Sequence, residues 1–329
     1  MKKILVMGAM VILFAPFCFG QLKWVNVDSL FQPLPSSVHV YKTTDPLDGK
    51  PNIAYYLEAD LKHKQLDFTV DTTYQRRLTP SKFYEKNNRP LLVVNTTFFS
   101  FATNQNLNLV IKNKKLVSYN IHTINGRGKD TFTYRHPLGS AIGISKKRFA
   151  DVAWLYTDSS KKFAYAAQKS VQPVKDSTGR FSLNDFLKQL SPIAGVTRRG
   201  MKMHIRWKMQ TAVGGGPVLL QNGEIKISNN EEIKFAGKAI NDRHPRTAMG
   251  YTRDNKLIIL VVEGRNTGKA EGATLTQLAQ ALKELGCWEA LNLDGGGSSC
   301  MLVNGKETIR VSDSSGQRPV PAVFIIKGK

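Results

Sequence analysis

Short apolar segments, each broken by Gly, Asn or Asp, most constrain how this 329-residue chain can fold. Segments of about four to eight residues are typical of β-strands, whereas helices need longer periodic runs. The segment 257–262 is apolar on both faces, which indicates a strand buried on both sides. The expected strands are residues 54–59, 66–70, 91–95, 107–111, 141–144, 217–220, 247–251, 257–263, 290–293 and 320–326.

Three helices are expected among these strands, beginning after Thr79, Ser182 and Thr274, whose hydroxyls can cap a first turn. The third is the best defined, because Gln277 completes a capping box with Thr274. The second is expected to end before Pro192, since proline breaks a helix interior. The pattern predicts an α+β fold with a mixed, strand-rich sheet core and a few packed helices.

The N-terminus has the pattern of a secretory signal peptide. Lys2 and Lys3 precede an apolar run over residues 4–19, and Gly20 supplies the small residue at its end. An uncleaved anchor is the alternative, but the run is shorter than the roughly 20 residues of a spanning helix. We expect cleavage near Gly20, export to a periplasm or the extracellular space, and no stable membrane insertion.

The remaining sequence is expected to form one main domain over residues 36–329, preceded by a leader, residues 21–35, with little core. The polar segment 158–210 is a possible insertion packed over the main sheet. Cys287 and Cys300 are the cysteines outside the signal peptide, so a disulfide scaffold is excluded. Both are expected to be small buried hydrophobic residues.

The chain is strongly basic, with a net charge of +22 and a pI near 9.9. A basic surface favours anionic partners such as phosphorylated glycans, an anionic envelope or nucleic acid. The lysines are scattered, however, and most are expected to be solvated surface residues. Because no RNP motif, zinc-finger spacing or helix-turn-helix is present, nucleic acid is not an expected partner.

Four segments place permissive glycines beside polar side chains at strand ends. In the first, a buried strand ends at Asn95, which is either a site residue or a turn residue. In the second, Gly214, Gly215 and Gly216 stand in a row. Such a row allows backbone amides to approach an anion, although a tight turn before a strand is the alternative.

The third segment joins Arg246 and Thr247, at the beginning of one strand, to Glu263 and Arg265 at the end of the next. Two arginines and a carboxylate on adjoining strand ends suit an acid/base group beside an anion clamp, or else a structural ion pair. The fourth segment is Asp294 at the end of a buried strand, followed by Gly295, Gly296, Gly297, Ser298 and Ser299. Three glycines leave the carboxylate open to a substrate atom, so we expect a functional role for Asp294.

In their order along the chain and in their residues, these segments resemble the phosphodiester glycosidase family. The resemblance extends from about residue 50 to the C-terminus and is densest at 214–217, 243–248 and 290–299. Two departures bear on the substrate. The family usually has Asn-Gly-Gly-Phe-Phe where this chain has Asn-Thr-Thr-Phe-Phe at 95–99, and commonly Asp-Gly-Arg where this chain has Glu-Gly-Arg at 263–265.

The resemblance implies a hydrolase that cleaves a sugar from a sugar-1-phosphate diester, such as a GlcNAc-1-phosphodiester, and leaves a phosphomonoester. On that basis Asp294 is the candidate nucleophile or base, and Glu263 its acid/base partner. The residues expected to hold the phosphate or orient the sugar are Arg246, Arg265, Gly214, Gly215, Gly216, Asn95, Thr247, Gly295, Gly296, Ser298 and Ser299.

Two other functions stay open at this point. One is a non-catalytic envelope glycan-binding module on the same fold. The other is a metal-dependent hydrolase that opens the phosphate ester, which the scattered spacing of the six histidines disfavours. No cofactor is expected, while a structural divalent cation near Asp294 or Glu263 is left open.

Overall fold

The computed structural model describes residues 21–194 and 205–328. The strands of this part form four sheets, in which every pairing between strands is antiparallel. The fold is therefore strand-rich with few helices, and more β-rich than the balanced α+β fold that we expected. The expected signal peptide, residues 1–20, lies outside the described residues. No helix of the described part is long and apolar enough to cross a membrane.

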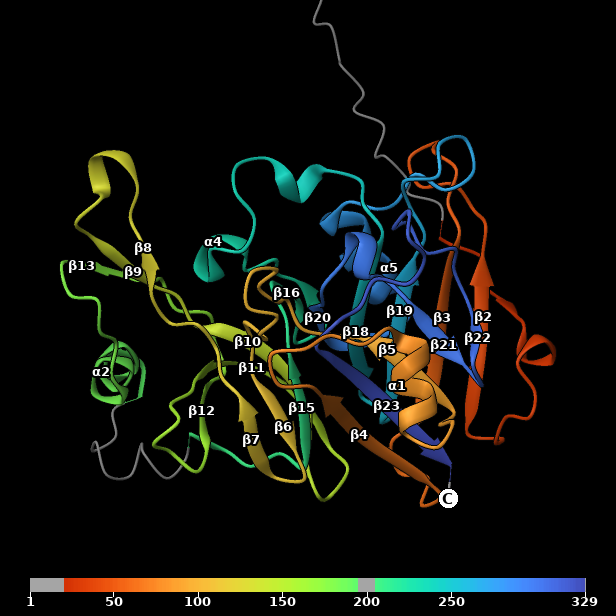
Figure 1. Ribbon diagram of the computed structural model, residues 1–329, viewed down its shortest axis with the longest axis horizontal. Coiled ribbons are helices and arrows are strands. Elements are labelled where there is room, and N and C mark those ends of the chain that lie inside the picture. The colour runs from red at the N-terminus through yellow and green to blue at the C-terminus, as the bar shows by residue number, and fades with distance from the viewer. Residues whose placement is uncertain (1–20, 195–204, 329) are drawn as a thin grey trace, which may run out of the picture.

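An eight-stranded sheet lies on the right of Figure 1, in the order β1-β2-β3-β19-β18-β20-β16-β17. Its strands are β1 Val25–Asn26, β2 Val38–Thr43, β3 Ala54–Asp60, β16 Val218–Gln221, β17 Glu224–Ile225, β18 Arg246–Thr252, β19 Lys256–Val262 and β20 Cys287–Asn292.

A seven-stranded sheet lies on the left of Figure 1, in the order β14-β12-β11-β10-β15-β6-β7. Its strands are β6 Val110–Lys112, β7 Lys115–Ser118, β10 Gly139–Ile144, β11 Ala150–Tyr156, β12 Ala164–Ala167, β14 Arg206–Trp207 and β15 Thr211–Gly214. The strand expected at 107–111 begins later, at Val110. The Leu109 amide donates to the side-chain oxygen of Asn120, so it is not available to a backbone oxygen of a neighbouring strand.

Two smaller sheets complete the strand pairing. A five-stranded sheet consists, in the order β22-β21-β5-β23-β4, of β4 Leu66–Thr72, β5 Leu92–Asn95, β21 Met301–Val303, β22 Lys306–Glu307 and β23 Ala322–Gly328. A three-stranded sheet consists of β8 Ile124–Asn125, β9 Tyr134–His136 and β13 Val174–Asp176.

The helices confirm most of the capping pattern. They are α1 Pro80–Lys86, α2 Leu183–Ala194, α4 Asn229–Glu232 and α5 Leu275–Glu284, with short 3₁₀ turns at Asp28–Leu30, Gly128–Asp130, Ala239–Asn241 and Gly296–Ser298. Thr79 caps α1, and Thr274 with Gln277 forms the capping box of α5. The expectation for α2 was wrong, because the helix continues through Pro192. A proline there costs a backbone hydrogen bond, but the apolar face around Phe186 packs into the core.

Strand β19 is buried on both faces, as its sequence indicates. Leu257, Ile259 and Val261 point into the largest core cluster, which the eight-, seven- and five-stranded sheets share. Ile258 and Leu260, on the opposite face, belong to a second cluster with the apolar stripe of α5. Successive side chains of a strand point to opposite faces, so alternate residues of β19 pack into two different core clusters.

The expected leader, residues 21–35, and the possible insertion, residues 158–210, both contribute to the sheets or to the core. In residues 21–35, strand β1 pairs with β2, and Phe31 is buried in the largest cluster. In residues 158–210, strands β12 and β14 extend the seven-stranded sheet. Cys287 and Cys300 are buried and unpaired, as expected.

A buried carboxylate joins the two large sheets. Glu232 of α4 accepts hydrogen bonds from the Trp154 indole at 3.1 Å and the Ser140 hydroxyl at 2.7 Å, both in the seven-stranded sheet. It also accepts from the Val218 amide at 2.9 Å in the eight-stranded sheet and from the Ser228 hydroxyl at 2.7 Å. Burial raises the pKa of Glu232, and these donors oppose that rise.

We predict that Glu232→Ala lowers the free energy of unfolding by about 3 kcal/mol, because the Trp154 and Val218 N–H groups lose their buried acceptor. Urea unfolding of Glu231→Ala is the matched control. The Glu231 side chain makes no hydrogen bond or ion pair with the described residues, so its removal should change little. Equal stability of the two variants would contradict a joining role for Glu232.

Candidate functional site

The predicted site segments meet at one end of the eight-stranded sheet because neighbouring strands run in opposite directions. Arg246 begins β18 and pairs with Val262, the last residue of β19. The end of β20 pairs with β18 and also with the beginning of β16. The residues before β16 and β18 and those after β19 and β20 therefore share one edge, near the point where β5 ends at Asn95.

Asn95 fixes the position of the chain at Asp294. Its amide nitrogen donates to the Asp294 backbone oxygen at 2.6 Å. Its amide oxygen accepts from the Thr247 hydroxyl at 2.9 Å and from the Cys300 backbone amide at 3.1 Å. The hydroxyls of Thr247 and Ser299 are in contact at 3.2 Å.

These contacts change the expected role of three residues. Asn95, Thr247 and Ser299 are at most 1% exposed, and their polar atoms bind one another or the backbone. They were expected to orient a sugar or phosphate. In the structure they are enclosed, and their hydrogen bonds hold the chain at Asp294.

The Asp294 side chain is half-buried, and burial raises the pKa of its carboxyl to about 7. The Ser298 hydroxyl, the Arg318 guanidinium and the Gly295 amide oppose the rise. The buried Ser298 hydroxyl approaches the carboxylate without forming a well-aligned hydrogen bond, and it has no other partner among the described residues. The carboxyl is thus shared between its acid and base forms near neutral pH, as a general base or nucleophile requires.

Two of the three glycines after Asp294 make room for an arginine. A Cβ atom on Gly295 would lie 2.8 Å from the Pro245 backbone oxygen, whereas one on Gly296 would lie 3.1 Å from the Arg265 guanidinium. A Cβ atom on Gly297 would overlap the guanidinium of Arg318. The glycines therefore bring cations close to the carboxylate, which a turn with side chains would exclude.

Two of these cations have no carboxylate partner in the described part of the chain. Arg246 is buried and donates to the backbone oxygens of Ala273 at 2.9 Å and Asp242 at 2.8 Å. Burial lowers its pKa to about 10, which the Asp242 charge opposes, so the guanidinium stays charged at neutral pH. Arg265 is exposed, and its guanidinium makes no hydrogen bond or ion pair with the described residues. Together they form a positively charged patch beside Asp294 that suits an anion.

Arg265 is also held in an uncommon backbone conformation, with φ at 59°. A left-handed backbone costs a non-glycine residue roughly 1–2 kcal/mol, and such strain is concentrated at functional sites. The conformation sends the Arg265 side chain back over Gly296.

The structure adds two residues that the sequence did not single out. Arg318 lowers the pKa of Asp294 and pairs with Asp313 at 2.8 Å. Burial, together with Arg246 and Arg265, lowers the pKa of the half-buried His244, so its imidazole is neutral near pH 7. The buried Nδ1 of His244 has no hydrogen-bond partner in the described residues. The sequence offered one indication for His244, which is its position two residues before the predicted site residue Arg246. Nothing in the sequence connects Arg318 with Asp294.

Glu263, the expected acid/base partner of Asp294, is occupied by contacts with residues other than Asp294. Its carboxylate is 4% exposed and accepts from the Asn266 side chain at 2.9 Å and from the Arg310 backbone amide at 3.0 Å. Glu263 is also not among the groups that set the pKa of Asp294. Its contacts fix the loop that carries Arg265.

The Gly214–Gly216 loop does not present free amides to an anion either. The three amides donate to the backbone oxygens of Leu109, Ser140 and Asn292 at 2.7, 3.0 and 2.7 Å. The glycines serve close packing: a Cβ atom on Gly215 would overlap the Asn292 carbonyl.

Beside this loop, two aromatic rings and a lysine border the arginine patch. Phe98 and Phe235 meet edge to face with their centroids 6.1 Å apart. The Lys234 ammonium lies 5.5 Å from the Phe98 centroid, and the Arg246 guanidinium lies 5.9 Å from that of Phe235. Burial lowers the pKa of Lys234, which the nearby Glu232 opposes. These rings offer an apolar face next to the charged groups.

Within residues 21–194 and 205–328, no group of three or more His, Cys, Asp or Glu side chains is arranged to hold a metal ion.

Comparison with protein families gives a match of residues 88–327 to the model described as phosphodiester glycosidase. N-acetylglucosamine-1-phosphodiester alpha-N-acetylglucosaminidase of Mus musculus is 32% identical over 95 residues, which are 26% of this chain and 18% of that protein. The SPbeta prophage-derived uncharacterized protein YomE of Bacillus subtilis (strain 168) is 39% identical over 74 residues, 22% of this chain and 11% of that protein. The matched stretches thus span less than a fifth of these relatives.

Two solved structures share the fold. A hypothetical protein from Synechocystis has a TM-score of 0.58 at 16% identity, covering 89% of this chain and 62% of that one. The catalytic domain of zebrafish N-acetylglucosamine-1-phosphodiester alpha-N-acetylglucosaminidase, auto-inhibited by its pro-peptide, has a TM-score of 0.56 at 21% identity, covering 91% and 85%.

We predict that Arg318→Gln raises the pKa of Asp294 above its value of about 7, because the lost positive charge favoured the ionised carboxylate. The measurement is a carboxyl ¹³C NMR titration of Asp294. Arg253→Gln is the control, since Arg253 stacks on Trp288 and is not among the groups that set this pKa. An unchanged or lower pKa in Arg318→Gln would refute the coupling.

Proposed function

Because this chain belongs to the phosphodiester glycosidase family, we propose that it hydrolyses a sugar-1-phosphate diester to free sugar and a phosphomonoester. One observation carries the proposal. Asp294, whose carboxyl has a pKa of about 7, begins a glycine turn that packs against two arginines with no carboxylate partner among the described residues. A diester of this kind combines an anionic phosphate with an electrophilic anomeric carbon, and these two features match the arginines and the carboxylate.

In this proposal, Arg246 and Arg265 hold the phosphate. The free guanidinium of Arg265 offers the paired N–H groups that bind phosphate oxygens side by side. Arg246 is anchored by backbone oxygens, so it adds positive charge without needing to reorganise. The neutral His244 supplies a further hydrogen-bonding atom close to both.

Asp294 acts on the sugar, as base or as nucleophile. As a base it takes a proton from water while the water oxygen bonds to the anomeric carbon. As a nucleophile it forms a glycosyl ester that water then hydrolyses. In both routes the anomeric C–O bond breaks and its electron pair leaves with the phosphate. A phosphate monoester is a stable anion, so cations assist its departure more than a strong general acid does.

Glu263 has a positioning role in this scheme. It holds Asn266 and the Arg310 amide, and thereby the loop in which Arg265 adopts its left-handed conformation. Phe98 and Phe235 would pack against an apolar face of the sugar or of the group on the far side of the phosphate.

We also propose that the enzyme acts after export, in a periplasm or outside the cell, on a phosphorylated glycan or a related sugar-1-phosphodiester. The N-terminal pattern of Lys2, Lys3 and an apolar run supports this location.

The test is a screen of α- and β-linked sugar-1-phosphate diesters, including a GlcNAc-1-phosphodiester, with free sugar and inorganic phosphate measured in parallel. Release of free sugar without inorganic phosphate supports the proposal. Saturable binding without any release would favour a glycan-binding module. Sugar-1-phosphate as a product, or transfer of ¹⁸O from labelled water to the phosphomonoester instead of the sugar, would indicate attack at phosphorus.

We predict that Asp294→Asn lowers kcat/KM by about 1,000-fold or more, because the amide can neither accept a proton nor attack carbon. In the wild type, kcat/KM should rise with pH through about 7, as the carboxyl ionises. A folded Asp294→Asn variant with wild-type turnover would refute the assignment.

Stability provides the folding control for this variant. The folded-state pKa of Asp294, about 7, lies above the ordinary aspartate value of 3.8, so the folded protein holds a proton on this carboxyl between these pH values. The free energy of unfolding of the wild type therefore falls as the pH rises through this interval. The Asp294→Asn variant has no carboxyl at this position, so it does not show that fall. Above pH 7 the variant should be more stable by about 2 kcal/mol in denaturant unfolding.

We predict that Arg265→Gln lowers kcat/KM by about 100-fold, because the developing phosphate charge loses its free guanidinium. Lys269→Gln is the matched control, since it removes one exposed positive charge from the same loop. A similar loss in both variants would show a general charge effect and no specific phosphate contact by Arg265.

A further inference from the structure

A cavity of about 230 Å³ lies on the seven-stranded sheet, lined by residues of β6, β7, β12 and β14 and of adjoining turns. Figure 1 shows these strands on the left of the molecule, whereas Asp294 follows β20 of the eight-stranded sheet. None of the site residues described above lines this cavity. It is a second concave surface, which we call the lysine pocket.

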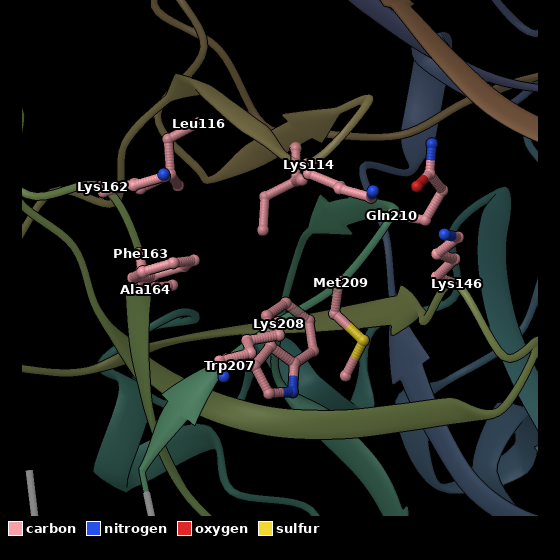
Figure 2. A pocket seen from close by; sticks show the side chains of 11 residues that line it. Lys114, Leu116, Lys146, Lys162, Phe163, Ala164, Trp207, Lys208, Met209 and Gln210 are labelled. Carbon is pink, nitrogen blue, oxygen red and sulfur yellow. The ribbon is translucent and has the colours of Figure 1, made fainter. Parts of the chain in front are cut away.

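The floor of the lysine pocket is apolar. Trp207 is 4% exposed and lies flat against the outer face of the sheet, where Gly143 leaves it room: a Cβ atom there would lie 2.6 Å from the indole. The indole nitrogen donates to Asp151, which fixes the ring. The half-buried Phe163 and Met209 stand beside it (Figure 2).

Four exposed lysines surround this floor: Lys114, Lys146, Lys162 and Lys208. No acidic residue lines the pocket, and none of the four has a carboxylate within ion-pair distance in the described chain. Figure 2 shows Lys114 and Lys146 at one end, with Gln210, and Lys162 at the other, near Phe163. Elsewhere lysines such as Lys86 and Lys112 pair with Asp71.

Four like charges around a small apolar floor repel one another unless an anion joins them. A ligand that fits must therefore carry negative charge and also present an apolar face to Phe163 and Met209. A sugar ring that bears a carboxylate, sulfate or phosphate has both features, since one face of the ring exposes mainly C–H groups.

We propose that the lysine pocket binds one ring of an anionic saccharide. The volume, below the roughly 300 Å³ of sites for larger ligands, suits a single ring. Single-stranded nucleic acid instead needs successive exposed aromatic platforms along a groove, whereas here Phe163 is half-buried and Trp207 is almost fully covered. The inference does not depend on the proposed hydrolysis, because it concerns binding at a separate place.

The experiment is calorimetric titration of the full chain at low and high salt. The probes are a galacturonate tetrasaccharide, a sulfated heparin tetrasaccharide, neutral maltotetraose and single-stranded oligothymidylate. We expect one or both anionic saccharides to bind, more weakly at high salt, and maltotetraose not to bind measurably. The two anionic probes distinguish a carboxylate-bearing from a sulfate-bearing ligand.

Variants place this binding in the pocket. The double variant Lys114→Gln/Lys146→Gln should weaken binding about tenfold or more, and Phe163→Ala should weaken it comparably. Lys82→Gln/Lys129→Gln removes two exposed lysines outside the pocket and should leave Kd unchanged. The lysine variants change only exposed side chains, so they keep the test valid even if Phe163→Ala impairs folding.

Three outcomes would overturn the proposal. The first is that neither anionic saccharide binds. The second is that binding persists unchanged in Lys114→Gln/Lys146→Gln. The third is that oligothymidylate binds more tightly than both saccharides and loses affinity in the same variant, which would assign the pocket to nucleic acid. Hydrolysis of a small diester is measured separately, so a failure here is distinguishable from a failure of the proposed activity.

Discussion

The hydrogen bond from the Asn95 side chain to the backbone oxygen of Asp294 joins two sheets at the point where the chemistry is proposed to occur. Asn95 ends a strand of the five-stranded sheet, and Asp294 follows the last strand residues of the eight-stranded sheet. The oxygen of the Asn95 amide accepts from Thr247 and Cys300, so both its nitrogen and its oxygen are hydrogen-bonded. A buried side chain whose partners lie inside the protein keeps a fixed geometry. Asn95 therefore fixes the backbone at Asp294, which would otherwise be less well held at the end of a strand.

Around this fixed point, opposing effects set the chemistry of the carboxylate. Burial favours the protonated acid, whereas Arg318, Ser298 and the Gly295 amide favour the anion, and the result is a pKa of about 7. Gly297 contributes to this balance because it leaves room for the Arg318 guanidinium, and Gly296 leaves room for that of Arg265. Burial lowers the pKa of His244, and its two neighbouring arginines add to this effect, so the imidazole is neutral near pH 7. A single turn thus controls both the acid–base state and the anion affinity of the site.

The high positive charge of the chain has more than one structural consequence. Some lysines form ordinary ion pairs, as Lys86 and Lys112 do with Asp71. Arg246 and Arg265 have no carboxylate partner among the described residues, and neither have the four lysines around Trp207. Unpaired cations beside apolar rings recur at two separate places, which is the arrangement expected of a protein that handles anionic, ring-containing ligands.

Local chemistry determined much of this protein from the sequence alone: strands such as β3, β5 and β18, the capped helices α1 and α5, and the doubly buried β19. It also led to the prediction that Asp294 is the centre of a site. These features depend on residues close together in the chain, so periodicity and turn chemistry reveal them. Tertiary structure decided the roles around Asp294. Asn95, Thr247 and Ser299 became buried supports, the Gly214–Gly216 amides were used by the backbone, and Glu263 turned to its own loop. Arg318, 24 residues beyond Asp294, joined the site. Strand register and packing set these contacts between distant residues, and no local pattern encodes them.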